Sequence, residues 1–242
     1  MLIFLLYNCG LELLDSLPEK LLKHPVIRSD IKKRKKKPSE ILLDLAVHQA
    51  AFTSKDQFNK GRPDIAHQCI LQFLFSSLIH PSVNQEPIKV QLVIHTIENK
   101  YFEVLPSWRP PVHYLRFRGL IEKLLKKRSL TVSTEDEIAL NVGNVGQIIK
   151  NYKPSKILLF TSHANSKTLS LHEFADLISP YYTSDELFVC LIGGYQHGQI
   201  PVPISKQVKD SKVPIQEIAL EGGRLASWKV LSLTLQAIEW KN

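Results

Sequence analysis

The sequence has few of the residues that build metal sites or disulfide frameworks. Its three cysteines, Cys9, Cys69 and Cys190, stand singly in apolar surroundings. Zinc sites and disulfide scaffolds need cysteines at paired or regular spacings, and no such spacing occurs here. We therefore expect no metal, a reducing compartment, and cysteines that serve as core residues.

Long hydrophobic runs are also missing. The longest apolar stretch, residues 70–79, is interrupted by Gln72, Ser76 and Ser77. It is shorter than the roughly 20 apolar residues that a membrane-spanning helix needs. The N-terminal MLIFLLYNCG resembles a signal-peptide core only briefly, because no basic segment precedes it and Glu12 follows at once. We expect a soluble protein without a membrane partner.

Two common phosphate-binding patterns do not occur. The sequence contains neither G-x-x-x-x-G-K-[ST] nor G-x-G-x-x-G, which weighs against a small nucleotide-binding enzyme. Internal repeats and long linkers are absent as well. With 44% hydrophobic residues, the chain can bury a sizeable core, and we predict a single domain over residues 1–242.

Positive charge is concentrated in two short zones. The formal net charge is +8, and residues 32–37 (KKRKKK) alone contribute six cations. Residues 109–128 hold seven more basic residues and only Glu122 as an acid, so the rest of the chain is net acidic. Such zones favour a polyanionic partner, nucleic acid above all. The KKRKKK run could be a nuclear-localisation signal, a nucleic-acid contact or a solvated loop, and the loop is the default interpretation.

Apolar periodicity predicts an α/β protein with a mainly parallel sheet and flanking helices. Apolar runs of strand length begin at Leu2, Lys156 and Leu187, and residues 88–105 form a predicted β-hairpin within an insertion of about residues 86–110. We expect a helix over residues 11–22 that Pro18 bends or restarts. Further helices are expected from about Ser39, from Pro63, and over residues 113–127, 134–150 and 169–178, with an amphipathic helix near the C-terminus.

Two late apolar runs each end in a glycine pair, Gly193-Gly194 and Gly222-Gly223. A strand that stops at glycine leaves its backbone groups accessible, because no Cβ shields them. Two such edges followed by an amphipathic helix could form a small-ligand pocket built from main chain. The alternative is that both glycine pairs are ordinary turns, and the glycine pairs alone favour this alternative.

The segment Arg62-Pro63-Asp64 stands where a helix is predicted to begin. Pro63 suits the first turn, and an acidic residue there is favoured by the helix dipole. An arginine at that end has no such structural reason. We expect Arg62 and Asp64 to form a local ion pair that holds the guanidinium in a fixed pose, as phosphate recognition requires.

These motifs together resemble the ribosome-biogenesis family of SPOUT-class pseudouridine methyltransferases. The matching segments are Gly61-Arg62-Pro63-Asp64-Ile65-x-His67, then VLPSWRPPVHYLRFRGL, LIGGYQHG and EIALEGGRLASW, in order over nearly the whole chain. GRPDI-x-H followed by the Pro/Arg segment is the more specific part. The resemblance implies S-adenosylmethionine as cofactor and ring nitrogen 1 of a pseudouridine in small-subunit rRNA as the methyl acceptor. It also implies a homodimer and a C-terminal trefoil knot over about residues 187–240.

The resemblance assigns roles residue by residue. Arg62, Arg109 and Arg116 would contact a single-stranded RNA loop, and Asp64 would orient Arg62 or, less favoured, act as the catalytic acid or base. Where the family often has a further arginine this chain has Val112, for which His113 or Arg118 could compensate. His67 is expected to be a packed or capped histidine. The cofactor positions would be Gly193, Gly198, Leu220, Glu221, Gly222, Gly223, Arg224 and Leu225.

Two further expectations follow from the resemblance. An Arg62→Ala variant should lose RNA affinity far more than cofactor affinity. The short N-terminus is similar to archaeal members, which favours the cytoplasm, with the nucleolus as the alternative for a eukaryotic protein. The rival interpretation is a non-catalytic RNA-binding factor in small-subunit assembly, which would show no affinity for S-adenosylmethionine.

Overall fold

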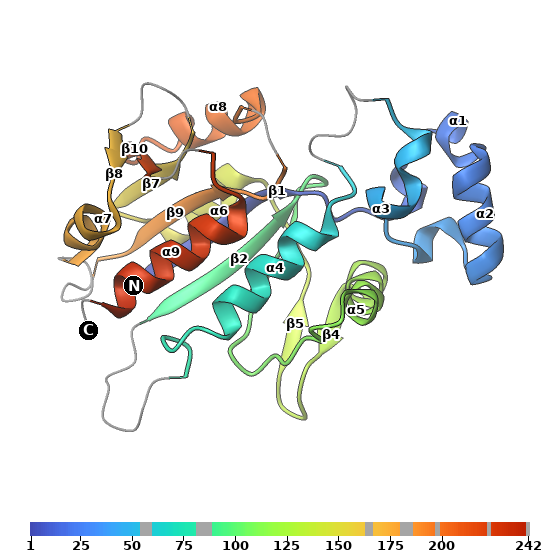
Figure 1. Ribbon diagram of the computed structural model, residues 1–242, viewed down its shortest axis with the longest axis horizontal. Helices are drawn as coiled ribbons and strands as arrows, with labels where there is room; N and C mark the ends of the chain where they lie inside the picture. The colour runs from blue at the N-terminus through green and yellow to red at the C-terminus, as the bar shows by residue number, and fades with distance from the viewer. Residues whose placement is uncertain are drawn as a thin grey trace.

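A sheet runs through the middle of the molecule (Figure 1). It has eight strands in the order β6-β3-β2-β1-β9-β7-β10-β8. The computed structural model describes residues 1–53, 60–80, 89–162, 167–179, 186–196, 199–221 and 224–240. The strands are β1 (Leu2–Cys9), β2 (Val90–Thr96), β3 (Lys100–Val104), β6 (Asn141–Val142), β7 (Lys156–Phe160), β8 (Lys167–Leu169), β9 (Phe188–Gly193) and β10 (Ile215–Leu220). The pairings from β2 through β8 are parallel, and those of β3 with β2 and β6 are antiparallel.

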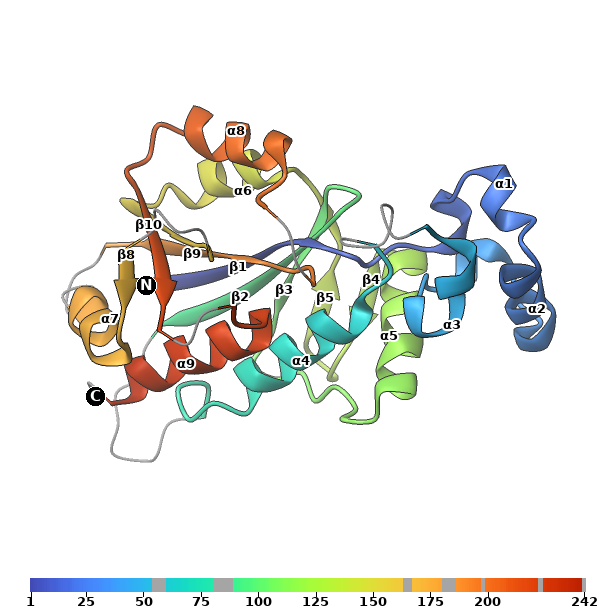
Figure 2. The same ribbon diagram turned by 45° about the horizontal axis from the view of Figure 1, so that its top comes forward.

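Helices cover both faces of this sheet (Figure 2). On one face lie α4 (Pro63–Leu74), α7 (Leu171–Ile178) and α9 (Ser227–Glu239), and on the other α6 (Val145–Tyr152) and α8 (Val202–Asp210). The remaining elements are η1 (Leu14–Ser16), α1 (Glu19–Leu22), α2 (Pro25–Arg34), η2 (Pro38–Glu40), α3 (Leu45–His48), η3 (Gln49–Ala51), α5 (Tyr114–Lys127), and the short pair β4 (Ser129–Thr131) and β5 (Glu137–Ala139).

The apolar character of β1 follows from its central place. All eight of its residues are buried. Alternate side chains enter different cores: Phe4 and Leu6 pack with α4 and α9, whereas Leu5 and Tyr7 pack with α6 and α8. A strand covered on both faces needs this continuous apolar run, as the sequence predicted. The fold class is therefore confirmed: a mainly parallel α/β sheet with flanking helices.

The predicted hairpin is present and belongs to the main sheet. β2 and β3 pair antiparallel from Leu92–Val104 to His95–Tyr101, and β2 also pairs in parallel with β1. The turn between them places Asn99 at a φ of 54°. Asparagine tolerates this left-handed conformation better than most residues do. The hairpin thus extends the sheet at one edge instead of standing apart from it.

The region between β1 and α4 differs from the helices predicted there. The helix expected over residues 11–22, bent or restarted at Pro18, forms only in part. As expected, α1 begins directly after Pro18, but η1 is a single 3-10 turn and Leu13 forms a bridge with Leu42. The helix expected from Ser39 is wrong for the same reason: Leu43 donates its amide to the Glu12 carbonyl over 2.8 Å. Pairing across the two segments satisfies backbone groups that a helix would have satisfied locally.

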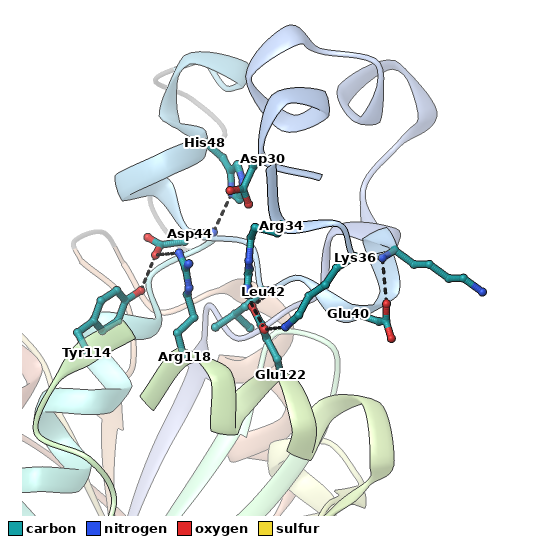
Figure 3. A network of polar contacts seen from close by, with 11 residues as sticks. Asp30, Arg34, Lys36, Glu40, Leu42, Asp44, His48, Tyr114, Arg118 and Glu122 are labelled. Atoms are coloured by element: carbon teal, nitrogen blue, oxygen red, sulfur yellow. Dashed lines mark hydrogen bonds and ion pairs between the residues drawn. The ribbon is translucent and has the colours of Figure 1, made fainter. Parts of the chain in front are cut away.

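The default interpretation of the KKRKKK run as a solvated loop holds only for its second half, residues 35–37, which are exposed beyond the end of α2. Lys32, Lys33 and Arg34 form the last turn of α2, where the negative end of the helix dipole stabilises positive side chains. Arg34 and Lys36 turn back onto the buried Glu122 of α5 (Figure 3). These two cations therefore have a structural partner inside the chain.

The helix predicted over residues 134–150 is wrong in its first half. Ile138 and Leu140 are buried while their neighbours Glu137 and Ala139 are exposed, which is the alternation of a strand. The helix α6 begins only after Asn144, whose side chain accepts from the Gln147 amide in a capping box. The helix predicted over residues 169–178 is confirmed from Leu171 onward.

The cysteines behave as the sequence predicted: Cys9, Cys69 and Cys190 are free and buried. Within the described residues, the structure shows no group of three or more His, Cys, Asp or Glu side chains able to hold a metal ion. Over the same residues, no helix combines the length and the apolar character that a membrane crossing requires.

Candidate active site

Three neighbouring parallel strands end at the same cleft. The carboxyl ends of β9, β7 and β10, which are adjacent in the sheet, supply Ile192 and Gly193, then residues 160–162, then Ala219 and Leu220. In open α/β sheets the carboxyl edge is where ligands bind, because strand ends and the following loops leave backbone groups uncovered there. The cleft has a volume of about 740 Å³, within the range of small-molecule sites.

The segment before α9 closes the cleft. Arg224, Leu225, Ala226 and the first residues of α9 line its wall. The Ser227 hydroxyl donates to the Gly193 carbonyl, so the start of α9 is tied to the end of β9. Next to it, Gly194 lies so close to β1 that an added Cβ would stand 2.4 Å from the Cys9 Sγ. Gly194 is thus required by packing, and Gly193 faces the cleft.

Arg62 is the one predicted RNA-contacting arginine that lines this cleft within the described residues. Its side chain is clamped by Asp64: Nε donates to Oδ1 over 2.8 Å and Nη2 donates to Oδ2 over 2.7 Å. Both bonds are charge-assisted, and together they fix the plane of the guanidinium. This hydrogen bonding raises the pKa of Arg62 further above its ordinary value. The expected ion pair across Pro63 is therefore confirmed.

The other predicted RNA residues lie elsewhere. Arg109 is exposed, and its Nη1 donates to the Pro106 carbonyl over 2.6 Å and to the Trp108 carbonyl over 3.0 Å. His113 precedes the first residue of α5 and is exposed, and Arg116 is exposed on that helix. The predicted helix over residues 113–127 is confirmed, but the structure brings only Arg62 to the cleft beside the strand ends.

Of the predicted cofactor positions, Gly193, Leu220, Arg224 and Leu225 line the cleft. Glu221 is exposed beyond the end of β10, and its amide donates to the Leu169 carbonyl over 3.0 Å. The remaining predicted positions, Gly198, Gly222 and Gly223, lie outside the described residues.

Arg118 cannot take the place of the arginine that Val112 lacks. Its Nη1 forms an ion pair with the Asp44 carboxylate over 3.2 Å, and only 12% of its side chain is exposed. Tyr114, one turn earlier on α5, donates its hydroxyl to the same carboxylate over 2.8 Å (Figure 3). Both side chains therefore point into the protein, whereas Val112 and His113 face outward.

His67 is a packed histidine, as predicted. Its ring stacks on Phe117 with centroids 4.2 Å apart, and its Nε2 is 2.9 Å from the Pro111 carbonyl. Burial lowers the pKa of His67. The ring joins α4, which begins next to Arg62, to the segment before α5. It holds the two arginine-bearing segments in a fixed arrangement.

Sequence reasoning missed the tyrosines of the cleft. Tyr7, at the end of β1, and Tyr195, after β9, both line it, with hydroxyl oxygens 3.3 Å apart and rings in edge-to-face contact. Thr161 and Ser162 were missed too. The signal was available in part, because these two residues directly follow an apolar run that was recognised as a buried strand.

A buried carboxyl group fixes the turn before Arg62. Glu12 is 1% exposed, and its Oε1 accepts from the Gly61 amide over 3.1 Å. Gly61 has a φ of 54°, and an added Cβ would meet the Leu43 side chain at 2.9 Å, so the turn requires glycine. Burial raises the pKa of Glu12 to about 8, against the opposing effects of the Gly61 amide and Lys60. The negative charge of Glu98 adds to the increase.

A Glu12→Gln variant should show a flatter dependence of stability on pH. In the wild type the folded state holds the Glu12 proton more tightly than the unfolded state, so the free energy of unfolding falls as pH rises from about 4.5 to about 8. The loss is on the order of a few kcal/mol, at about 1.4 kcal/mol for each pKa unit. Glutamine keeps the acceptor for Gly61 and cannot ionise.

Urea unfolding at pH 5, 6.5 and 8 measures this effect. The exposed Glu135, changed to glutamine, is the matched control and should follow the wild-type curve. Parallel curves for wild type and Glu12→Gln would mean that Glu12 does not titrate in this range.

Comparison with known proteins decides the family. A family model described as EMG1/NEP1 methyltransferase matches residues 4–239. The chain belongs to the EMG1/NEP1 methyltransferase family. This confirms the resemblance drawn from the GRPDI-x-H, Pro/Arg and glycine-pair motifs.

Two curated relatives match this chain over most of their length. The chain is 31% identical over 231 residues to a protein of Pyrococcus furiosus called ribosomal RNA small subunit methyltransferase Nep1, covering 94% of this chain and 93% of that one. A protein of the same name from Saccharolobus solfataricus is 34% identical over 188 residues, covering 76% of each chain.

A solved structure has the same fold. The crystal structure of Archaeoglobus fulgidus Nep1 bound to S-adenosylhomocysteine matches 99% of this chain and 97% of that chain, with a TM-score of 0.76 at 28% identity. The EMG1/NEP1 fold thus accounts for the whole arrangement described above, including the sheet edge that carries the cleft.

Proposed function

We propose that this EMG1/NEP1 family member transfers the methyl group of S-adenosylmethionine to ring nitrogen 1 of a pseudouridine in small-subunit rRNA. One observation carries the proposal: the clamped guanidinium of Arg62 lines the same cleft as the ends of β7, β9 and β10. A cofactor site built from main chain and a phosphate-binding side chain from the first half of the sequence therefore share one space. The names of the relatives support the RNA substrate, and the solved relative supports the cofactor.

The residues of the cleft fit the methyl donor. Phe160, Ile192, Leu225 and Trp228 provide apolar surface for an adenine ring, and the strand ends provide backbone donors and acceptors. The described lining residues include no carboxylate. When bound, S-adenosylmethionine supplies a methyl group already activated on a sulfonium centre. Glu221 and, outside the described residues, Gly198, Gly222 and Gly223 stay predicted cofactor positions.

The chemistry of the acceptor explains what the chain has to do. Pseudouridine is joined to its ribose through carbon, so its ring nitrogen 1 carries a proton and is free to be methylated. In such a transfer the nitrogen gains a bond to the methyl carbon as the bond from that carbon to sulfur breaks, S-adenosylhomocysteine is the leaving group, and the proton of the nitrogen is released to solvent. The protein must place the nitrogen in line with the S–C bond and exclude water. RNA bases in loops are splayed out for such reactions.

Arg62 would hold a phosphate beside the splayed nucleotide, because a clamped guanidinium presents a fixed pair of donors. Both Asp64 oxygens accept hydrogen bonds from Arg62, which favours the orienting role over direct proton transfer. Arg109, Arg116 and His113, on the segment leading into α5 and on that helix, would contact flanking nucleotides. This arrangement fits a substrate larger than one nucleotide.

We also propose a single domain with a C-terminal trefoil knot, acting as a homodimer. The position of β9 between β1 and β7, with the later β10 on the far side of β7, supports a chain that returns through its own sheet. The free buried cysteines fit the reducing environment of the cytoplasm.

Methyl transfer from labelled S-adenosylmethionine to a short RNA hairpin tests the function. Two hairpins should be compared, with uridine or pseudouridine at one loop position. We expect transfer only to pseudouridine, since uridine has no free nitrogen 1. Transfer to both hairpins would refute the assignment of ring nitrogen 1 of pseudouridine as the methyl acceptor. Tight RNA binding without affinity for S-adenosylmethionine would instead support the non-catalytic assembly factor.

A further inference from the structure

A second hollow lies on the outer side of α5, away from the cofactor cleft. It has a volume of about 430 Å³ and opens between α5 and the segment that follows α2. Lys36 borders it on one side, and Arg116, Gly119, Lys123 and Lys127 border it on the other. The α5 residues are spaced by three, four and four, so they form one stripe along the helix. We call this hollow the α5 groove.

The acidic groups in the α5 groove are already paired within the chain. Glu122 accepts two bonds from Arg34, at 2.6 and 2.8 Å, and one from Lys36 at 2.7 Å (Figure 3). Glu40 accepts from Lys126 and from the Lys37 amide. These carboxylates cannot also neutralise the cations of the stripe.

The stripe itself is left with unpaired positive charge. Arg116, Lys123 and Lys127 are exposed and have no acidic partner among the described residues. Lys123 and Lys127 are one turn apart, where like charges repel and weaken a helix. An external polyanion would remove this repulsion, and its binding would release counterions.

Gly119 has no structural reason to be glycine. It lies in the middle of α5, it is not among the described residues with positive φ, and an added Cβ would meet nothing within 4 Å. Glycine in a helix interior lowers stability relative to alanine, so the chain bears a cost here without a packing benefit. Gly119 lines the α5 groove, where bare backbone lets another molecule approach closely.

We propose that the α5 groove binds the sugar-phosphate backbone of the RNA substrate, in a part of the RNA outside the nucleotide to be methylated. The proposal rests on the proposed function. The cations would contact phosphates, and Leu115, which is 58% exposed at the groove, would contact ribose. From Arg116 to Lys127 the stripe is about 16 Å long, at about 1.5 Å for each residue. This length suits several successive phosphates better than one small anion.

The helix links the α5 groove to the cofactor cleft. Its first turn carries Tyr114, which contacts Asp44 on the side opposite the stripe. The negative charge of Asp44 also acts on Arg62, which lines the cleft. One RNA molecule that places a base in the cleft would therefore extend along the outer side of α5.

The salt dependence of RNA binding tests this proposal. A Lys123→Ala/Lys127→Ala variant should bind the pseudouridine hairpin about tenfold more weakly at low salt. The slope of log K against log salt should fall in magnitude by about 1.4, since each lost phosphate contact contributes about 0.7 on single-stranded RNA. A Lys150→Ala/Lys206→Ala variant removes equal charge from α6 and α8 on the other face and should keep the wild-type slope. Affinity for S-adenosylmethionine should be unchanged in both.

Gly119→Ala separates RNA contact from folding. We expect this variant to melt a few degrees higher than the wild type, because alanine favours the helix. It should nevertheless bind the hairpin severalfold more weakly, while its affinity for S-adenosylmethionine stays that of the wild type. A purely structural glycine would give neither effect.

The two proposals can fail separately. Wild-type RNA affinity and salt slope in the Lys123/Lys127 variant would overturn the α5 groove proposal, even if methyl transfer to pseudouridine is observed, and would leave an acidic protein as the alternative partner. Wild-type protein that binds RNA with the expected slope but methylates no hairpin would overturn the proposed function and leave the groove supported.

Discussion

Methyl transfer to the pseudouridine hairpin should fall about 100-fold in kcat/KM when Arg62 is replaced by alanine. Losing hydrogen bonds to a charged group removes about 1.5–3 kcal/mol of binding, which corresponds to roughly 10- to 150-fold. The dissociation constant for S-adenosylmethionine should change less than about threefold. A guanidinium contributes little to holding a cationic sulfonium, although Arg62 borders the same cleft.

Single-turnover methyl transfer and calorimetric titration of the cofactor measure the two effects on the same protein. Arg62→Lys keeps the charge but loses the two-bond clamp to Asp64, so it should recover only part of the activity. Lys150→Ala, which removes an exposed cation from α6, should behave like the wild type. If RNA transfer and cofactor affinity fall together in Arg62→Ala, the assignment of Arg62 to the RNA is wrong.

Asp64→Asn distinguishes the two roles considered for Asp64. A residue that orients Arg62 should raise KM for RNA while the pH dependence of kcat stays that of the wild type. A proton acceptor would instead lose kcat and change that pH dependence. We expect the first result, because both Asp64 oxygens are occupied by Arg62.

The largest effect on stability is expected from Glu122→Gln. Glu122 is 3% exposed and accepts bonds from Arg34, Lys36 and the Leu42 amide. Removing one partner of a buried ion pair leaves the other charge uncompensated, which typically costs about 3–5 kcal/mol. We expect the free energy of unfolding at pH 7 to fall by about 3 kcal/mol, with α2 released from α5 first.

The pH dependence of the same variant supplies a second check. Burial alone would raise the pKa of Glu122, but the bonds from Arg34, Lys36 and Leu42 outweigh it and lower the pKa below its ordinary value. A lowered pKa means that this contribution is present above about pH 4.5 and is lost as pH falls further. The difference between wild type and Glu122→Gln should therefore shrink in acid.

Urea unfolding at pH 7 and pH 3.5 gives both results. Glu137→Gln, at an exposed position of β5, removes one carboxylate without an ion pair and should change stability by less than about 0.5 kcal/mol. A Glu122 variant as stable as this control would show that the ion pairs of Glu122 with Arg34 and Lys36 do not contribute to the free energy of unfolding.

Local sequence signals predicted the site where one segment contained the whole feature. Pro63 lies in the first turn of α4, as predicted, and Arg62 forms the predicted ion pair with Asp64, two positions later in the chain. The hairpin from Val90 to Val104 and the helix after His113 were equally local. Predictions were wrong where a distant segment competed. Ile41–Leu43 pairs with the chain around Glu12, and no spacing within either segment records that pairing.

The sequence by itself determined the fold class, the buried strands, the family motifs and the clamp on Arg62, because each follows from residues that are neighbours in the chain. Only the tertiary structure decided that Arg62 borders the cleft at the ends of β7, β9 and β10, that Glu12 holds the turn at Gly61, and that Glu122 neutralises part of the basic run. Glu12 and Gly61 are 49 positions apart in the chain, and Arg34 and Glu122 are 88 positions apart. Their formation depends on how the sheet orders its strands, which short-range periodicity does not encode.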